Sequence, residues 1–109
     1  MHALSGRVLV DFGGDWCGDC QVLDIYLHRS PNKELLQQNY VVVHVPVGEG
    51  NDKNVDLRAK YGILKKGVPA LTVLDANGKV VYTQSTTEFS TMRSMNPNSV
   101  TEFLMKWKA

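Results

Sequence analysis

Residues 7–20, with the sequence RVLVDFGGDWCGDC, decide the fold of this 109-residue chain. Residues 8–12 form a short, almost continuously apolar run, which is typical of a strand covered on both faces. A turn at residues 13–15 follows, and a helical period begins at Cys17. Both cysteines, Cys17 and Cys20, therefore stand where a buried strand passes into a helix. A C-x-x-C pair in that place indicates a thiol–disulfide redox site.

The length and composition of the chain fit one globular domain spanning residues 1–109. Hydrophobic residues make up 43% and charged residues 21%, so a disordered chain is not expected. The formal net charge is +1, which gives no electrostatic reason to expect nucleic acid or an anionic membrane as a partner. No apolar run approaches the roughly 20 residues of a membrane helix.

The remaining sequence predicts further strands and helices in a definite order. Helices are predicted from Cys17 onward and over residues 31–38, 52–61 and 97–108, and a β-branched, buried strand over residues 40–47. Asn77 and Gly78 separate strand patterns at residues 70–75 and 79–83, which is a strong hairpin signal. The order β-α-β-α-β-β-α predicts an α/β fold, in which helices flank both faces of a central mixed β-sheet.

The two cysteines are expected to play different parts. Cys17 should lie in the first turn of its helix, where unpaired N–H groups and the helix dipole favour a thiolate. Because a thiolate attacks disulfides, Cys17 is the candidate nucleophile. Cys20 lies one helical turn further on and is expected to be the more buried, resolving thiol. Run in reverse, the same steps oxidise a substrate dithiol.

Three neighbouring side chains are expected to affect the reactivity of this cysteine pair or its contacts with substrate. Asp11 lies inside a buried strand, where a charged carboxyl group is costly, so it is a candidate general base for Cys20; the alternative is an exposed, idle acid at the strand edge. Asp19 adds a negative charge that opposes the helix dipole, holds protons on the thiols and favours a more reducing couple. Trp16 is expected either to offer substrates an apolar surface or to fill the core.

A metal site is the main alternative use of the cysteine pair. Zinc needs four ligands, and the other candidates are His2, His28, His44 and carboxylates. No second C-x-x-C pair and no histidine pair at zinc-finger spacing is present in the sequence, so no metal or other cofactor is expected. We interpret His44, inside a predicted strand, as a satisfied core histidine.

Four ordered motifs resemble the thioredoxin-like superfamily over nearly the whole chain. They are Val10-Asp11-Phe12, Trp16-Cys17-Gly18-Asp19-Cys20, Lys60-Tyr61-Gly62-Ile63 followed by Gly67-Val68-Pro69-Ala70-Leu71, and Asp75-Ala76-Asn77-Gly78-Lys79-Val80. They match the family's strand with a buried aspartate, its W-C-G-x-C active site, its K-Y-G-I and V-P-T-L segments, and its hairpin. The Gly-Asp dipeptide and the longer connections are more similar to bacterial thiol:disulfide interchange and disulfide isomerase-type proteins than to housekeeping thioredoxin.

The resemblance implies a protein disulfide oxidoreductase, acting as a reductase or an isomerase. Cys17 would be its nucleophile, Cys20 its resolving thiol and Asp11 its buried proton acceptor. It further implies a cis peptide bond before Pro69, and a backbone N–H and C=O at Val68 that pair with an extended substrate strand. The remaining residues expected to contact substrate are Trp16, Gly18 and Asp19.

The expected partners are proteins with disulfides or dithiols and a redox partner that resets the cysteine pair. We expect a monomer, with no nucleic-acid partner and no membrane span in this chain. No signal-peptide pattern is visible, so we expect the periplasm if a leader has been removed and the cytoplasm otherwise. Two other functions stay open at this point: a metal-binding module or metallochaperone that uses the same pair, and a non-catalytic interaction domain, against which two intact cysteines argue.

Overall fold

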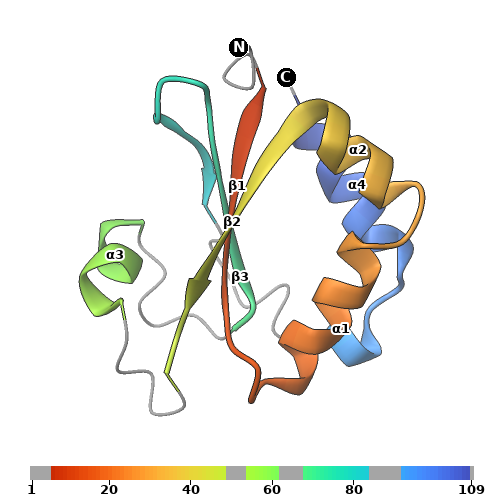
Figure 1. Ribbon diagram of the computed structural model, residues 1–109, viewed down its shortest axis with the longest axis horizontal. Helices are drawn as coiled ribbons and strands as arrows, with labels where there is room; N and C mark the ends of the chain where they lie inside the picture. Colours follow the sequence, from red (N-terminus) through yellow and green to blue (C-terminus); the bar gives the residue numbers. More distant parts are fainter. Residues whose placement is uncertain (1–5, 49–53, 62–67, 84–91, 109) are drawn as a thin grey trace.

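The computed structural model describes residues 6–48, 54–61, 68–83 and 92–108 (Figure 1). The described strands are β1 (Arg7–Gly13), β2 (Tyr40–Pro46), β3 (Ala70–Leu74) and β4 (Val80–Thr83). The described helices are α1 (Gly18–Leu27), α2 (Asn32–Asn39), α3 (Val55–Lys60), the short 3-10 helix η2 (Met92–Ser94) and α4 (Asn98–Trp107). These elements are consistent with the predicted order. In the matched motifs, Gly62, Ile63 and Gly67 lie outside the described residues.

The described strands form one mixed sheet in the order β2-β1-β3-β4. β1 pairs in parallel with β2, because the helices α1 and α2 connect the two strands. β3 runs antiparallel to both β1 and β4. The predicted hairpin joins β3 to β4, and Gly78 in its turn has a φ of +86°, a conformation that glycine adopts without strain. The predicted α/β fold with a mixed sheet is therefore confirmed.

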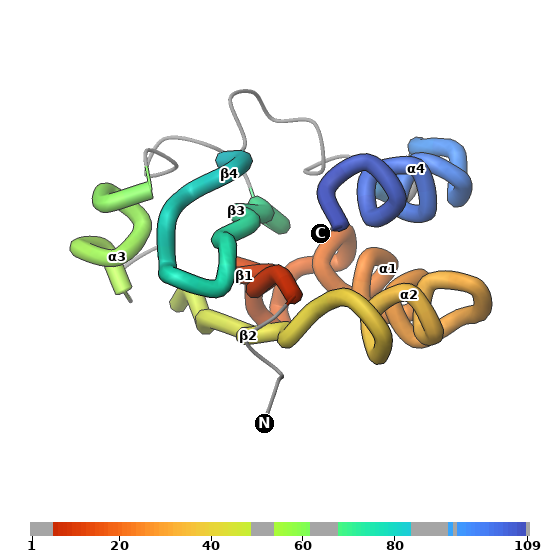
Figure 2. The backbone as a smooth tube through the Cα atoms, turned by 90° about the horizontal axis from the view of Figure 1, so that it is seen from above, coloured from red at the N-terminus to blue at the C-terminus, as the bar shows by residue number. Residues whose placement is uncertain are grey.

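The alternation of side chains along β1 gives each face of the sheet its own core. Leu9 packs with buried residues of α1 and α4, such as Leu23 and Leu104, whereas Phe12 packs on the opposite face with Leu57 of α3. Figure 2 shows α1, α2 and α4 together on one side of the sheet and α3 on the other. Asp11 comes two residues after Leu9, so it faces α1, the helix that carries Cys20.

β2 lies at the edge of the sheet, and the expectation of a buried strand over residues 40–47 was wrong, because most of its residues are partly or fully exposed. In the described sheet β2 pairs with β1 alone, and Val41 and Val43 are 39% and 42% exposed. Its apolar run resembles that of a central strand, because β-branched residues favour extended backbone wherever the strand lies. Val41 and Val43 lie on the face of the sheet opposite α1, whereas His44 lies on the α1 face, where its side chain is 57% exposed.

The amphipathic helix predicted near the C-terminus is present as α4. Its apolar residues Val100, Phe103 and Leu104 are buried against the sheet, at the spacing that places side chains on one face of a helix. Among the described helices, none combines the length and the apolar character needed to cross a membrane.

Candidate active site

The turn between β1 and α1 places the two cysteines at the helix N-terminus. Cys17 is the N-cap residue of α1, with extended backbone angles of φ −101° and ψ 114°. The backbone N–H of Cys20 donates a hydrogen bond to Cys17 Sγ over 3.1 Å. A disulfide joins the two residues, whose Cα atoms are 5.2 Å apart. In the reduced state the same N–H and the helix dipole would stabilise a thiolate at Cys17.

Val68, which comes shortly before β3, lies beside the sulfur of Cys17. The peptide bond between Val68 and Pro69 is cis, as the resemblance implies. The carbonyl oxygen of Val68 lies 3.6 Å from Cys17 Sγ, although the two residues are 51 positions apart in the sequence. The structure thus brings Val68, Pro69 and the cysteine pair together.

Trp16 lies on the surface beside Cys17. Trp16 is 41% exposed, so the alternative that it fills the core was wrong. The ring is nevertheless held in place, because its Nε1 donates a hydrogen bond of 2.8 Å to the carbonyl oxygen of Val47. A fixed, half-exposed indole ring beside a reactive sulfur offers an apolar surface to a bound molecule.

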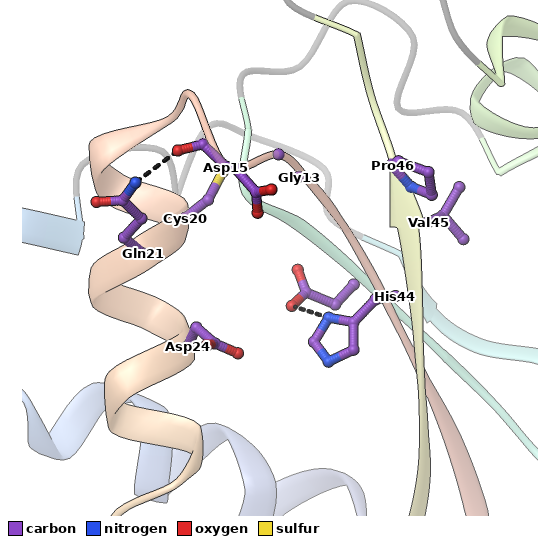
Figure 3. A pocket seen from close by; sticks show the side chains of 10 residues that line it. Gly13, Asp15, Cys20, Gln21, Asp24, His44, Val45 and Pro46 are labelled. Carbon is purple, nitrogen blue, oxygen red and sulfur yellow. Dashed lines mark hydrogen bonds and ion pairs between the residues drawn. The ribbon is translucent and has the colours of Figure 1, made fainter.

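The burial of the two cysteines is the reverse of the prediction. Cys17 is 8% exposed, whereas Cys20 is only partly buried. Val68 covers the Cys17 sulfur, while Cys20 borders a cavity of about 380 Å³ between α1 and the edge strand β2 (Figure 3). The expectation assumed that β2 was covered, and an edge strand instead leaves the Cys20 side open.

Asp11 lies in the wall of this cavity and is 7% exposed, so the alternative of an idle surface acid was wrong. A Cβ built on Gly13 would lie 2.9 Å from Cys20 Sγ and 4.0 Å from Asp11 Oδ1. The carboxyl oxygen and the sulfur therefore both lie close to the position that a side chain at residue 13 would occupy.

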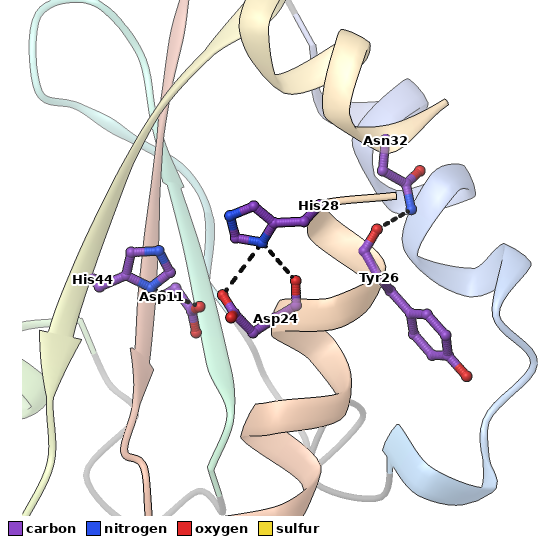
Figure 4. A network of polar contacts seen from close by, with 6 residues as sticks. All are labelled: Asp11, Asp24, Tyr26, His28, Asn32 and His44. Atoms are coloured by element: carbon purple, nitrogen blue, oxygen red, sulfur yellow. Dashed lines mark hydrogen bonds and ion pairs between the residues drawn. The ribbon is translucent and has the colours of Figure 1, made fainter. Parts of the chain in front are cut away.

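His44 is part of this site, and the interpretation of it as a core histidine was wrong. Its Nδ1 lies 3.2 Å from Asp11 Oδ2, and its side chain is 57% exposed (Figure 4). The hydrogen bond with Asp11 raises the pKa of His44 above the usual 6.5, burial opposes this, and the charges of Asp11 and Asp24 add to it. Asp11 and His44 are partners in the register of the parallel pair β1 and β2, and the pattern within either strand alone gives no sign of this pairing.

The two residues between the cysteines form the start of α1. Gly18 is its first residue and Asp19 lies in its first turn, and both are partly buried. A carboxylate at a helix N-terminus interacts favourably with the dipole, and its charge competes with a thiolate for the same electrostatic stabilisation. The predicted effect of Asp19 on the couple therefore stays a prediction.

The structure was compared with the alternative that the cysteine pair is part of a metal site. Within the described part of the chain, no group of three or more histidine, cysteine, aspartate or glutamate residues is placed to hold a metal ion. His28 instead bonds within α1, where its Nδ1 lies 2.8 Å from the carbonyl oxygen of Asp24 (Figure 4).

Comparison of the sequence with known proteins relates this chain to a family. Residues 2–76 match a family model described as Thioredoxin-like. Two proteins from Campylobacter jejuni strains, each called thiol:disulfide interchange protein DsbD, are 28% identical to the chain over 72 residues. This match covers 66% of the chain and 12% of each relative, so the chain spans about an eighth of their length.

Solved structures show the same similarity. A disulphide isomerase from Xylella fastidiosa superposes with a TM-score of 0.87 and 34% identity, covering 94% of this chain and 78% of that one. A mutant thioredoxin from Halobacterium salinarum superposes with a TM-score of 0.63 and 24% identity, covering 97% of this chain and 78% of that one. The second likeness supports the fold alone.

Proposed function

Because the chain belongs to the thioredoxin-like family, we propose that it is a thiol–disulfide oxidoreductase that reduces or isomerises disulfides in proteins. The proposal rests on the position of Cys17 and on the contacts that its sulfur makes. It caps α1, accepts a hydrogen bond from the Cys20 N–H, is bonded to Cys20 and faces the cis bond before Pro69. The similarity to a disulphide isomerase and to thiol:disulfide interchange proteins supports this reaction class.

The first chemical step uses the thiolate of Cys17. Its electron pair attacks one sulfur of the substrate disulfide, a new bond forms between Cys17 and that sulfur, and the substrate S–S bond breaks. The other substrate sulfur leaves as a thiolate and takes up a proton. The N–H of Cys20 supports this step, because it stabilises the charged sulfur before attack.

The second step releases the substrate. Cys20 gives up its proton to Asp11, and the resulting thiolate attacks Cys17 Sγ. The bond between Cys17 and the substrate sulfur breaks, and the disulfide between Cys17 and Cys20 forms. Two electrons have then passed from the dithiol to the substrate, and a separate redox partner must return them.

Substrate binding is proposed for the surface around Cys17. Val68 offers its backbone to an extended peptide, and Trp16 offers an exposed ring beside the reactive sulfur. Gly18 and Asp19 border the same sulfur from the start of α1.

The charge of Asp19 favours the reducing direction. Known couples of this fold range from roughly −270 to −120 mV, from reductants to oxidants. A negative charge near Cys17 destabilises its thiolate and so keeps the proton on the thiol, which makes the reduced form less stable than it would be beside a neutral residue. The reduction potential is then lower and the couple more reducing, so we expect the protein to act as a reductase or an isomerase.

Turnover of insulin with a small dithiol as electron donor tests the proposed function. The wild-type protein should accelerate insulin reduction, whereas Cys17→Ser should abolish the acceleration and Cys20→Ser should stop multiple turnover. A wild-type protein with no effect, or a Cys17→Ser variant with full activity, would contradict the proposal.

A further inference from the structure

We propose that Gly14 is a positioning residue that selects substrates. Because it has no side chain, the ring of Trp16 can lie against the backbone, where it contacts an aromatic or large aliphatic side chain next to the reacting cysteine of the substrate. This inference rests on the proposed function and deepens it, since it names a class of substrate and a residue that favours it. Gly14 acts through Trp16 and needs no contact of its own with the substrate.

The turn between β1 and α1 is bonded to the residue that follows β2. Because β1 and β2 are parallel, both strands end at the same edge of the sheet (Figure 1). The N–H of Val47 donates a hydrogen bond of 2.8 Å to the carbonyl oxygen of Gly13, and the carbonyl oxygen of Val47 accepts one of 2.8 Å from Trp16 Nε1. The N–H of Cys17 donates to the carbonyl oxygen of Gly14 over 3.2 Å. These bonds fix the short segment that carries both the indole ring and the reactive sulfur.

The carbonyl group that holds the ring belongs to a buried residue. Val47 is 2% exposed and lies in the same buried cluster as Phe12 of β1. Close packing in such a cluster leaves little room for Val47 to shift. The indole N–H is the only hydrogen-bonding group of a tryptophan side chain, so one bond to a fixed acceptor determines how the ring of Trp16 is turned.

Gly14 provides the space in which the ring lies. A Cβ built on Gly14 would collide with Trp16 Nε1, and it would lie 2.9 Å from Trp16 Cδ1 and 3.0 Å from the carbonyl oxygen of Val47. The backbone of Gly14 is not in the left-handed region, so its conformation does not require glycine. The close approach of the ring does require it. Since Val47 is held by the core, a side chain at residue 14 would displace the ring of Trp16.

The position of the ring indicates what it recognises. Trp16 is 41% exposed and directly precedes Cys17, so its free surface lies beside the sulfur that a substrate must reach. Among the described residues that we assign to substrate binding, Trp16 alone has an aromatic ring. Such a ring packs well against aromatic and large aliphatic side chains. A ring that is already fixed loses little conformational freedom when a substrate binds, which strengthens that contact.

Two synthetic peptides test the proposal. Each contains an internal disulfide, and they differ only in having phenylalanine or serine next to each cysteine. Both kcat and KM are measured with a small dithiol as electron donor, after subtraction of its direct reaction with the peptide. The wild-type protein should prefer the phenylalanine peptide about 10-fold in kcat/KM, mainly through a lower KM. Gly14→Ala should reduce this preference to about twofold by raising the KM for that peptide.

Two controls separate displacement of the ring from general damage to the fold. Gly78→Ala is the same substitution at a residue where no atom lies within 4 Å of the added Cβ, and it should keep the wild-type preference. Trp107→Phe leaves Trp16 as the single tryptophan of the chain. In that background, Gly14→Ala should make the fluorescence of Trp16 easier to quench with acrylamide, because the ring has left Val47.

A double variant decides whether Gly14 acts through Trp16. Trp16→Ala should lose the preference, and adding Gly14→Ala should change it no further. If Gly14→Ala alone does not fold, the double variant should fold, because the ring no longer blocks the added Cβ.

The outcomes that overturn the inference leave the proposed function intact. They are a wild-type protein with no preference for the phenylalanine peptide, a folded Gly14→Ala that keeps the preference, a further change in the double variant, and a double variant that does not fold. A wild-type protein that reduces neither peptide would instead contradict the proposed function itself.

Discussion

Replacing Gly13 by alanine should make the cysteine pair easier to reduce. The added Cβ would lie 2.9 Å from Cys20 Sγ and 3.3 Å from Cys20 Cβ, so one of these atoms must move. In the disulfide, Cys20 Sγ is tied to Cys17 and cannot rotate away. In the dithiol it can adopt another rotamer, so the substitution destabilises the oxidised protein more than the reduced one.

The size of the effect follows from the cost of overpacking. Extra methyl groups in a packed site cost about 1–3 kcal/mol. If that cost falls mainly on the oxidised form, the reduction potential rises by about 20–65 mV, because 1.4 kcal/mol corresponds to about 30 mV. The melting temperature of the oxidised protein should fall by about 4–12 °C, and that of the reduced protein by less.

Two measurements test this reasoning together. Equilibration with glutathione redox buffers gives the potential, and thermal unfolding of both redox forms gives the stability difference, which must agree with the potential shift. Gly78→Ala is the matched control, because no atom lies within 4 Å of its added Cβ and its φ of +86° strains both forms alike. Equal destabilisation of both forms of Gly13→Ala, with an unchanged potential, would refute the argument.

Three further predictions concern the charged residues of the site. When the reduced protein reacts with the chromogenic disulfide dithiobis(nitrobenzoate), Cys17 releases one coloured thiolate and Cys20 then releases the second. Asp11→Asn should slow release of the second thiolate about 100-fold and leave the first unchanged; equal slowing of both would argue against a role in resolution. The ion pair of His44 with Asp11 should stabilise the folded state fully below pH 6.5. This contribution, below about 1 kcal/mol because the histidine is more than half exposed, should disappear as the pH rises through the elevated pKa of His44. Chemical denaturation of wild type and His44→Asn at several pH values measures it, and a difference that grows with pH would have the wrong sign. Asp19→Asn should favour the Cys17 thiolate and raise the reduction potential by about 5–20 mV, whereas a lower potential would reverse the assigned effect of this charge.

Local patterns were enough to predict the central strand, the helix start and the hairpin. The apolar run of β1, the two cysteines after it and the Asn77-Gly78 turn each have a short-range physical cause. The burial of Asp11 also followed from the local pattern, because this acid stands inside an otherwise apolar strand. The cis bond before Pro69 came from the resemblance and not from the pattern.

The parts that the sequence did not predict depend on which elements become neighbours. The apolar run of β2 gives no sign that this strand lies at an edge, and both errors at the site follow from that. An open edge exposes His44 and the Cys20 side of the disulfide, whereas Val68, far away in the sequence, covers Cys17. These relations are set by strand order, which periodicity within one segment does not encode.

The identity of the attacking sulfur is the central claim, and trapping tests it most directly. Cys20→Ala and Cys17→Ala should each be incubated with a disulfide-containing protein such as insulin, and the covalent adducts mapped by mass spectrometry. We expect a stable mixed disulfide through Cys17 in Cys20→Ala and none in Cys17→Ala. An adduct through Cys20 in the second variant, or no adduct in either, would contradict it.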